Sequence, residues 1–498
     1  MNLSELIEDL NIDKINGKTD IDIKGISSNS KTVKGCYLFV CIEGFVVDGH
    51  KYITEAIKNG ASAVLLQKDI QLPKDISVIR VQDTRKALAL LANRYYGYPS
   101  RKLKLIGITG TNGKTTVAYM LKAILEEANK KTGLLTTVEN IIDNESEETK
   151  MTTMESLDLQ KAFSKMLSAG AEYCIMEVSS HSLSLSRVDG CDFDVAVFTN
   201  ISDEHFEIHN NFQNYLESKK RLFQSLNPAG NKINQKTGII NLDEIYAQEF
   251  INCFEAEKIT YGIEKEAMFR ASNIFIDIKE TRFTAKTPIG DVEILLKMSG
   301  KYNVYNALAA MTAAVNQGIS LEVIARAFRK FLGAPGRYKI IEYGQPYAII
   351  IDFAHNFHGL EHILKTLRLF PRNKIITIFG HGGERDSRVR EKMGKVVGMY
   401  SDYSIITADN PRSESLEKIA REIEKGLKAV KNSNYQVILD RFQAIEHALN
   451  IAKKNDIVLI AGKGPEREQV YHNRIIYHND EEVVSEILTG KGENRCLD

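Results

Sequence analysis

The sequence predicts an α/β protein of three domains, in which the central and C-terminal domains are built on mostly parallel sheets. The first observation is length, because 498 residues correspond to about three domains at roughly 150 residues each. The second is the alternation of strand-like apolar runs with helical patterns, which is typical of α/β sheets. The third is a glycine-rich turn near residue 110 between a strand-like run and a helix, an arrangement that binds phosphate. Segments rich in proline and glycine mark the predicted domain boundaries, which give domains at 1–100, 101–335 and 336–498.

Composition indicates an ordinary globular protein with ample core, because 43% of residues are hydrophobic and 26% are charged. Lys plus Arg number 65 and Asp plus Glu number 65, so no global charge favours nucleic acid or a membrane as a partner. The six cysteines lack CxxC spacing, which favours thiols in a reducing cytosol over disulfides or a metal site. No apolar run reaches about 18 residues and the first residues do not resemble a signal peptide, so we expect a cytoplasmic protein.

The first 100 residues form a small α/β unit. Strand-like runs lie at 36–42, 62–66 and 77–81, with helical patterns at 52–59 and 84–96. Two polar loops, at 27–31 and 48–50, lie beside these strands. Turn chemistry alone explains them, but they could also hold the polar head of a ligand.

The turn after the apolar run 103–109 is the strongest functional signal. It is followed by apolar residues from Val117 to Ala128 at helical spacing, so the turn lies at a helix N-terminus. There the backbone amides, the helix dipole and Lys114 attract phosphates, and the hydroxyl of Thr115 can ligate Mg²⁺. The match to a P-loop is partial, because Ile108 replaces its first glycine. We predict a nucleotide site formed by Gly110, Thr111, Asn112, Gly113, Lys114, Thr115 and Thr116.

Two further segments of the central domain are candidates for metal binding. Glu177 ends the buried run 173–177 and is well placed for Mg²⁺, although a solvated strand end would look the same. His205 and His209 are four residues apart among acids, which suits metal ligands but is also a common helix spacing.

The C-terminal domain alternates strands and helices, which predicts a mostly parallel sheet with helices on both faces. We expect strands at 347–352, 374–380, 403–407, 435–439 and 456–461. We expect helices near 358–370, 388–400, 415–430 and 441–454. Ligands of such sheets collect beyond the carboxyl ends of the strands, and four polar loops lie there. They are 352–355, 382–386, 409–412 and 462–466.

Five motifs together resemble the Mur ligase family of bacterial cell-wall synthesis, and the resemblance covers nearly the whole chain. They are GTNGKTT at 110–116, MEVSSH at 176–181, NVYNALAA at 303–310, DNPR at 409–412 and AGKG at 461–464. The resemblance implies an N-terminal domain for the UDP end of a substrate, a central domain for ATP, and a Rossmann-like C-terminal domain for an amino acid. It implies ATP-driven amide formation through an acyl phosphate, with ATP and Mg²⁺ as cofactors and a UDP-N-acetylmuramoyl dipeptide as acceptor.

The resemblance also implies roles for individual residues. The residues implied around ATP are the turn at 110–116 together with Asn303, Arg337, Asp352 and His355. The implied metal ligands are Thr115 and Glu177, and His205 is the implied ligand of a second Mg²⁺. Lys219 matches a lysine that CO₂ carbamylates, and the implied catalytic residues are Lys114, Lys219, His205 and Arg337. The UDP-sugar peptide would meet Ser30, Thr152, Thr153, Ser179 and Arg187. The amino acid would meet Arg385, Asp409, Asn410, Arg412, Gly464 and Glu466.

The DNPR motif at 409–412 resembles the signature of ligases for meso-diaminopimelate, and the resemblance implies that amino acid. Its physical logic is that the guanidinium of Arg412 can bind the distal carboxylate by a two-point fork. The implied acceptor is then UDP-N-acetylmuramoyl-L-alanyl-D-glutamate. Departures from the family pattern include Glu204, Asn356 and Pro465. They leave open a ligase for lysine or another amino acid, a paralogue with another acceptor, and a binding protein without catalysis. A folylpolyglutamate synthetase is a remoter alternative, and a simple kinase or transporter ATPase leaves the C-terminal loops unexplained. We expect a monomer.

Overall fold

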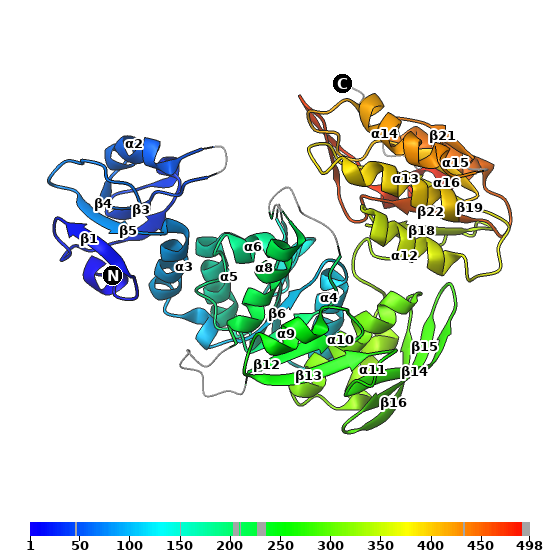
Figure 1. Ribbon diagram of the computed structural model, residues 1–498, viewed down its shortest axis with the longest axis horizontal. Helices are drawn as coiled ribbons and strands as arrows, with labels where there is room; N and C mark the ends of the chain where they lie inside the picture. The colour runs from blue at the N-terminus through cyan, green and yellow to red at the C-terminus, as the bar shows by residue number, and fades with distance from the viewer. Residues whose placement is uncertain are drawn as a thin grey trace.

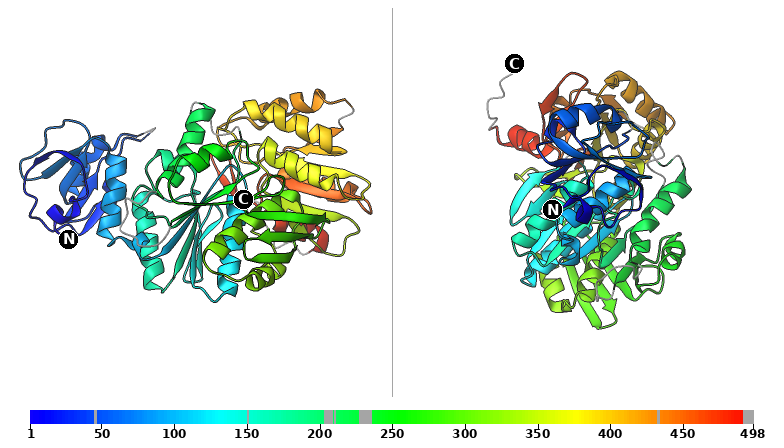
Figure 2. Two further views of the ribbon diagram at one scale, coloured as in Figure 1. Left: turned by 60° about the horizontal axis from the view of Figure 1, so that its bottom comes forward. Right: turned by 90° about the vertical axis from the view of Figure 1, so that its left-hand side faces the viewer.

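The computed structural model describes residues 1–44, 47–149, 151–202, 209, 211–226, 236–431 and 434–490. Three lobes follow one another along the chain, and Figures 1 and 2 show the N-terminal lobe at one end of the long axis. The central lobe joins it to the C-terminal lobe, which lies beside the central lobe in both figures. Each lobe has its own sheet, and each sheet falls within one of the predicted ranges.

The N-terminal sheet has five strands in the order β1-β5-β4-β3-β2, parallel except for β1. Alternate residues of its strands point to opposite faces, so Leu38 and Phe39 belong to separate cores. The strands are β1 (Ile12–Asn16), β2 (Gly25–Ser27), β3 (Tyr37–Val40), β4 (Ala61–Leu66) and β5 (Ser77–Val81). The helices are α1 (Leu3–Leu6), α2 (Ile53–Lys58) and α3 (Thr84–Tyr95), with short 3₁₀ turns η1 (Ser30–Thr32), η2 (Gly49–Tyr52) and η3 (Pro99–Arg101).

The central sheet has eleven strands, parallel in its middle and antiparallel at both ends. Its order is β16-β15-β14-β13-β12-β11-β6-β10-β7-β8-β9. The strands are β6 (Lys104–Thr109), β7 (Thr132–Leu135), β8 (Glu139–Ile142), β9 (Glu145–Glu148), β10 (Tyr173–Glu177), β11 (Val195–Phe198), β12 (Thr237–Asn241), β13 (Glu257–Gly262), β14 (Phe269–Ile276), β15 (Thr281–Thr287) and β16 (Gly290–Leu296). The antiparallel ends were not predicted.

Helices cover both faces of the central sheet. One core joins the sheet to α4 (Lys114–Glu127), α10 (Lys301–Asn316) and α11 (Leu321–Lys330). The other joins it to α5 (Ser156–Ser168), α6 (Ser180–Ser184), α8 (Phe212–Gln224) and α9 (Ala247–Asn252). The middle strands are therefore buried on both faces, which explains their continuous apolar sequence.

The C-terminal sheet has six strands in the order β17-β18-β22-β19-β20-β21, and only β17 is antiparallel. These strands are β17 (Lys339–Ile341), β18 (Ala348–Asp352), β19 (Ile375–Phe379), β20 (Tyr403–Ile406), β21 (Tyr435–Val437) and β22 (Ile457–Ala461). Helices α12 (Phe357–Leu367), α13 (Arg388–Tyr400) and α14 (Leu416–Lys428) pack on one face, and α15 (Arg441–Ile451) and α16 (Asp480–Thr489) on the other. A hairpin of β23 (Glu468–Val470) and β24 (Ile475–Tyr477) completes the domain. The predicted α/β fold with mostly parallel sheets is confirmed.

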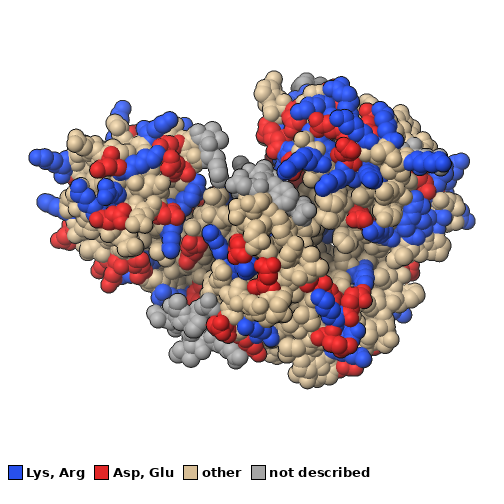
Figure 3. Space-filling view, viewed as in Figure 1, with Lys and Arg blue, Asp and Glu red and all other residues tan. Residues whose placement is uncertain are grey.

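The surface carries both signs of charge. Figure 3 shows Lys and Arg interspersed with Asp and Glu on one face, and a notch between the N-terminal and C-terminal lobes. Among the described residues, no helix combines the length and apolar character needed to span a bilayer.

Candidate functional site

The turn at residues 110–116, which is predicted to bind phosphate and is named the phosphate turn, lies between β6 and α4, as its sequence predicts. Gly113 has a φ of +85°, and a Cβ there would lie 2.4 Å from Asn306 Oδ1. At Gly110 the φ is +149°, and a Cβ would lie 1.9 Å from Thr199 Oγ1. Both glycines are therefore required by close neighbours as well as by backbone conformation. Lys114 Nζ donates to the carbonyls of Gly110 and Thr111 at 3.0 and 2.9 Å, which holds its ammonium against the turn.

The carboxylate of Glu177 lies beside the first turn of α4. Strands β10 and β6 are parallel neighbours, so the end of β10 is brought to the phosphate turn. Thr115 Oγ1 donates to Glu177 Oε1 at 2.8 Å. Thr137 donates to the same carboxylate from its backbone amide at 3.0 Å and from its hydroxyl at 3.1 Å. Glu177 is 1% exposed, and these three hydrogen bonds fix its orientation.

Lys219 reaches the same turn from the opposite face of the sheet. It lies on α8 and is 2% exposed, and its Nζ donates to Gly110 O at 2.9 Å. The ammonium also lies 4.5 Å from the centroid of the Tyr215 ring. Two lysines from different helices thus bind the carbonyl of Gly110, which concentrates positive charge at the turn.

A polar strip extends from Glu177 along the central domain. The hydroxyl oxygens of Thr152 and Thr137 lie 3.1 Å apart. The hydroxyl of Thr153 donates to Glu177 O at 2.9 Å, and its oxygen lies 3.3 Å from Ser179 Oγ. Arg187 donates to Thr153 O at 3.1 Å and forms an ion pair with Glu155 at 2.6 Å.

One cleft of about 1630 Å³ is lined by the central and C-terminal domains together. Arg337 crosses between them, with its guanidinium 4.2 Å from the Phe353 ring centroid and Nη2 donating to Thr115 Oγ1 at 3.3 Å. Burial lowers the pKa of Arg337, and burial raises the pKa of Asp352 although Arg337 opposes that shift. Of the predicted residues the cleft brings together Gly110, Thr111, Asn112, Gly113, Lys114, Thr115, Thr116, Thr152, Thr153, Glu177, Ser179, Arg187, Lys219, Asn303, Arg337, Asp352, His355, Arg385, Asn410, Arg412, Gly464 and Glu466.

A smaller cavity of about 240 Å³ opens within the C-terminal domain at the carboxyl ends of its strands. Four cations and three acids line it together, namely Arg385, Arg388, Lys392, Arg412, Asp386, Asp409 and Glu466. Arg412 has a φ of +51°, and its Nη1 donates to Gly383 O at 2.5 Å. His381 lines the same cavity, and burial, aided by Arg390, lowers its pKa to about 3, so the imidazole is neutral. A cavity with both signs of charge suits a zwitterion.

Ser30 is not brought into this cleft, and Asp409 lines only the smaller cavity. Ser30 lies in the N-terminal lobe, where its hydroxyl donates to Glu55 Oε2 at 2.7 Å. His205 lies outside the described residues, as does the departure at Glu204. Among the described residues, no three His, Cys, Asp or Glu side chains form a group that could hold a metal.

Other residues of the site were missed by the sequence analysis. Thr137 orients Glu177, but the loop after β7 carries no motif that would have identified it. Burial raises the pKa of Glu244, which lines the cleft, to about 7. Gly336, with a φ of +63°, leaves room for Pro465, because a Cβ there would lie 2.2 Å from Pro465 N. The segment that enters the C-terminal domain therefore lies directly against the loop 464–466.

Comparisons with known proteins agree with this architecture. Three family profiles match: "Mur ligase family, catalytic domain" at 22–96, "Mur ligase middle domain" at 108–314, and "Mur ligase, glutamate ligase domain" at 336–464. A relative from Caldanaerobacter subterraneus subsp. tengcongensis is 43% identical over 95% of this chain and 96% of its own. One from Clostridium botulinum is 41% identical over 98% of this chain and 99% of its own. Both are named UDP-N-acetylmuramoyl-L-alanyl-D-glutamate–2,6-diaminopimelate ligase.

Solved structures give the same fold. A structure of a protein with that same name has a TM-score of 0.70 at 27% identity, covering 98% of this chain and 99% of its own. Folylpolyglutamate synthase of Mycobacterium tuberculosis, complexed with ADP and AMPPCP, has a TM-score of 0.62 at 17% identity, covering 82% of this chain and 96% of its own. The second likeness concerns the fold alone.

Proposed function

The chain belongs to the Mur ligase family, and on that premise we propose that it joins meso-diaminopimelate to UDP-N-acetylmuramoyl-L-alanyl-D-glutamate with the conversion of ATP to ADP and phosphate. The observation that carries the proposal is the shared cleft. The phosphate turn and the loops holding Arg412 and Glu466 line it from two domains, so an activated acid and an amine can meet there. Holding two reactants together in this way can contribute several kcal/mol, about 7–11 in favourable cases.

Activation is needed because a carboxylate is a poor electrophile. In the proposed sequence a carboxylate oxygen of the acceptor attacks the γ-phosphorus, and ADP leaves. The amine then attacks the acyl carbon and loses a proton, and phosphate leaves from the tetrahedral intermediate. Lys114 and the amides of the turn 110–116 are proposed to hold the phosphates, and Arg337 is proposed to stabilise charge that develops between them.

The residues beside the turn fit a magnesium ion. The hydroxyl of Thr115 and the carboxylate of Glu177 are oxygen donors 2.8 Å apart, and Mg²⁺ binds through one or two protein oxygens plus substrate phosphates. When bound, the ion would neutralise charge on the transferred phosphoryl group. His205 is proposed as a ligand for a second Mg²⁺, with Lys219 supporting that site after carbamylation.

The C-terminal cavity is proposed to hold the amino acid. Diaminopimelate carries two carboxylates and two amines, and the cavity offers arginines and acids in one place. Arg412 is assigned to the distal carboxylate and Glu466 to an ammonium, with Arg385, Asp409, Asn410 and Gly464 completing the site. Thr152, Thr153, Ser179 and Arg187 are proposed to contact the muramoyl peptide, and Ser30 to lie near the uridine. Because ATP and UDP-linked precursors are cytoplasmic, we place the reaction in the cytoplasm, catalysed by a monomer.

A panel of amino acids tests the assignment. Purified protein is incubated with ATP, Mg²⁺ and UDP-N-acetylmuramoyl-L-alanyl-D-glutamate, and the mass of the product is measured with each amino acid. We expect product and ADP with meso-diaminopimelate and far less with L-lysine, which lacks the second carboxylate. Equal or better turnover with L-lysine would identify a lysine-adding ligase instead. Binding of the substrates without product from any amino acid would favour a non-catalytic protein.

A further inference from the structure

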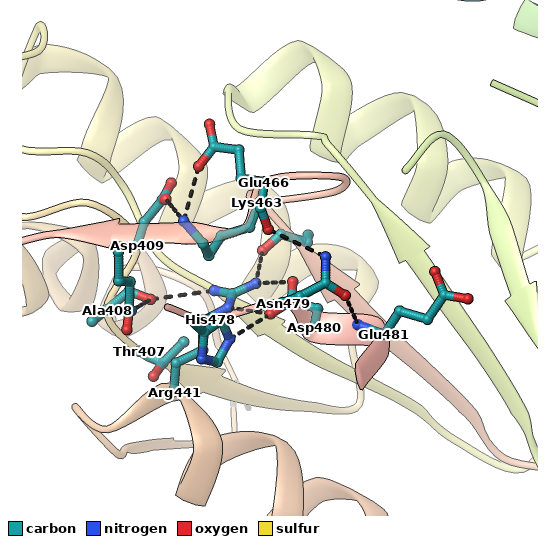
Figure 4. Close-up of polar contacts among 12 residues, drawn as sticks. Thr407, Ala408, Asp409, Arg441, Lys463, Glu466, His478, Asn479, Asp480 and Glu481 are labelled. Atoms are coloured by element: carbon teal, nitrogen blue, oxygen red, sulfur yellow. Dashed lines mark hydrogen bonds and ion pairs between the residues drawn. The ribbon is translucent and has the colours of Figure 1, made fainter. Parts of the chain in front are cut away.

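Lys463 is a fully buried cation directly behind the proposed amino-acid site. Its side chain is 0% exposed, and neither of the two cavities is lined by it. The ammonium donates to Glu466 Oε2 at 2.8 Å, to Glu468 O at 2.7 Å and to Asn410 Oδ1 at 3.2 Å. A buried ammonium is retained only where such acceptors compensate its lost hydration. Figure 4 shows Lys463 extending toward Glu466 and Asp409.

These bonds fix two side chains that line both cavities. Asn410 Oδ1 accepts from Lys463 and, at 3.0 Å, from Val470 N, so its Nδ2 must face the other way. That nitrogen donates to Glu466 Oε2 at 2.8 Å. One carboxylate oxygen of Glu466, Oε2, therefore accepts from two protein donors. The other, Oε1, accepts no hydrogen bond from the described residues, and Glu466 lines both cavities.

A second buried pair holds the strands on which these loops begin. Arg441 and Asp480 are both 0% exposed and form two hydrogen bonds of 2.7 Å. Arg441 also donates to Ala408 O at 3.3 Å (Figure 4) and to Ala461 O at 3.0 Å, the last carbonyls before Asp409 and Gly462. The backbone at the start of the loops 409–412 and 462–466 is thus fixed by Arg441 and not by Lys463. The orientation of the Asn410 and Glu466 side chains depends on Lys463.

We propose that Lys463 is a positioning residue for the amino-acid substrate: it orients Asn410 and holds Glu466 so that one oxygen of its carboxylate receives a substrate ammonium. This inference rests on the proposed function of the C-terminal cavity. It assigns Lys463 to recognition of the amino acid, because two of its three closest acceptors, Asn410 and Glu466, line the smaller cavity. ATP and the UDP-linked acceptor should be bound as before when Lys463 is changed.

The test compares Michaelis constants for the three substrates in Lys463→Met, which keeps an unbranched side chain and removes the charge. We expect KM for the amino acid to rise about tenfold or more, the effect of losing charge-assisted hydrogen bonds, while the other two KM values stay near parental. Lys236→Met is the matched control, because Lys236 of the central domain has a side chain only 8% exposed, pairs with Asp192 at 2.6 Å and lines neither cavity. A crystal structure of Lys463→Met should show Asn410 or Glu466 reoriented.

The outcomes separate this inference from the function on which it rests. An unchanged KM for the amino acid, or an equal rise for all three substrates, would overturn the positioning role. If the parent protein makes no product with any amino acid, the proposed function fails, and the crystal structure alone decides: unmoved Asn410 and Glu466 side chains would overturn the inference. If Lys463→Met does not fold, Lys463→Gln is judged by the same measurements.

Discussion

Arg337 Nη2 donates a hydrogen bond to Thr115 Oγ1 at 3.3 Å, which joins the segment entering the C-terminal domain to the phosphate turn. Thr115 in turn donates to Glu177, so the contact extends to the proposed metal ligands. The position of the C-terminal domain and the arrangement of the phosphate site are therefore linked through one hydroxyl.

Replacing Lys114 with alanine should abolish most catalysis without changing the fold. We expect kcat to fall about 10²–10³-fold, the usual cost of removing one donor that stabilises transition-state charge. Release of ADP measures the effect. Lys122→Ala is the control, because Lys122 lies on the same helix and pairs with Glu126 away from the turn. Parental turnover in Lys114→Ala would exclude a role for this ammonium in phosphoryl transfer.

Carbamylation of Lys219 has a direct spectroscopic test. Protein equilibrated with ¹³C-bicarbonate should show a carbamate carbon resonance that is missing from Lys219→Arg, and the variant should lose turnover. The buried amine lies against Gly110 O, so a carbamate there would place an anion beside the phosphate turn. The same resonance in both proteins would assign it to another amine, and an active Lys219→Arg would show that carbamylation is dispensable.

Arg412→Lys should weaken binding of diaminopimelate in particular. A lysine keeps the charge but cannot form a two-point fork, and losing one hydrogen bond to a charged group costs about 1.5–3 kcal/mol, or roughly 10–150-fold in KM. Binding of L-lysine as a poor substrate should change less. The control is Arg388→Lys in the same cavity, because Arg388 is 69% exposed and pairs with Asp386. Equal losses in both variants would remove Arg412 from its assigned role.

The buried Arg441–Asp480 pair predicts a dependence of stability on pH. Burial opposes ionisation of Asp480, but Arg441 outweighs it and holds the pKa of that carboxyl below its ordinary value. The unfolded carboxyl has a pKa of about 3.9, so the stabilisation is complete above that pH and is lost as pH falls below it. Asp480→Asn should lower the free energy of unfolding by about 3–5 kcal/mol at neutral pH. The free energy of unfolding of this variant should also fall less on acidification than that of the parent protein.

Urea unfolding at pH 7 and in mild acid measures both effects. Asp22→Asn is the control, because Asp22 pairs with the N-terminal amine but is 65% exposed, so its loss should change the free energy of unfolding far less. If Asp480→Asn and Asp22→Asn change the free energy of unfolding by the same amount, burial of the Arg441–Asp480 pair contributes nothing to stability.

Alanine substitutions at two glycines with positive φ distinguish the cost of backbone strain from the cost of a steric clash. Gly344→Ala should cost about 1–2 kcal/mol, because its φ is +86° and no heavy atom lies within 4 Å of the added Cβ. Gly336→Ala should cost more, because its Cβ would collide with Pro465, and it should also raise KM for the amino acid by moving the loop 464–466. Thermal unfolding and kinetic measurements on the two variants check these expectations. Equal losses of stability and an unchanged KM would mean that the loop around Pro465 moves aside at little cost.

The fold was predictable where the sequence repeats a simple period. The apolar run of β6 and the helical spacing of α4 place the phosphate turn correctly, and the five predicted strands of the C-terminal sheet are present. The antiparallel ends of the central sheet were missed for a physical reason. Strand β9, for example, has the sequence ESEE and is exposed throughout, so it carries no apolar pattern and is set by pairing with β8.

The site was predictable from motifs only in part. Spacing along the chain does not indicate that Lys219 and Lys114 meet at Gly110 O, because that contact depends on how α8 packs. Lys463 follows the wholly apolar strand β22 between two glycines, but lysines are rarely fully buried, so the sequence pattern alone does not predict its burial. Its partners could not be named before the fold was known.

The contact between Gly336 and Pro465 has a consequence for engineering hybrid ligases. Gly336 begins the C-terminal module and Pro465 follows the last strand of its main sheet, β22, yet neither can be exchanged without regard to the other. A graft that imports the module from a relative should begin upstream of Gly336, so that donor and recipient residues are never mixed across this contact. A crossover point placed between them would set the native Gly336 against the donor's residue at position 465, a combination that neither parent protein provides.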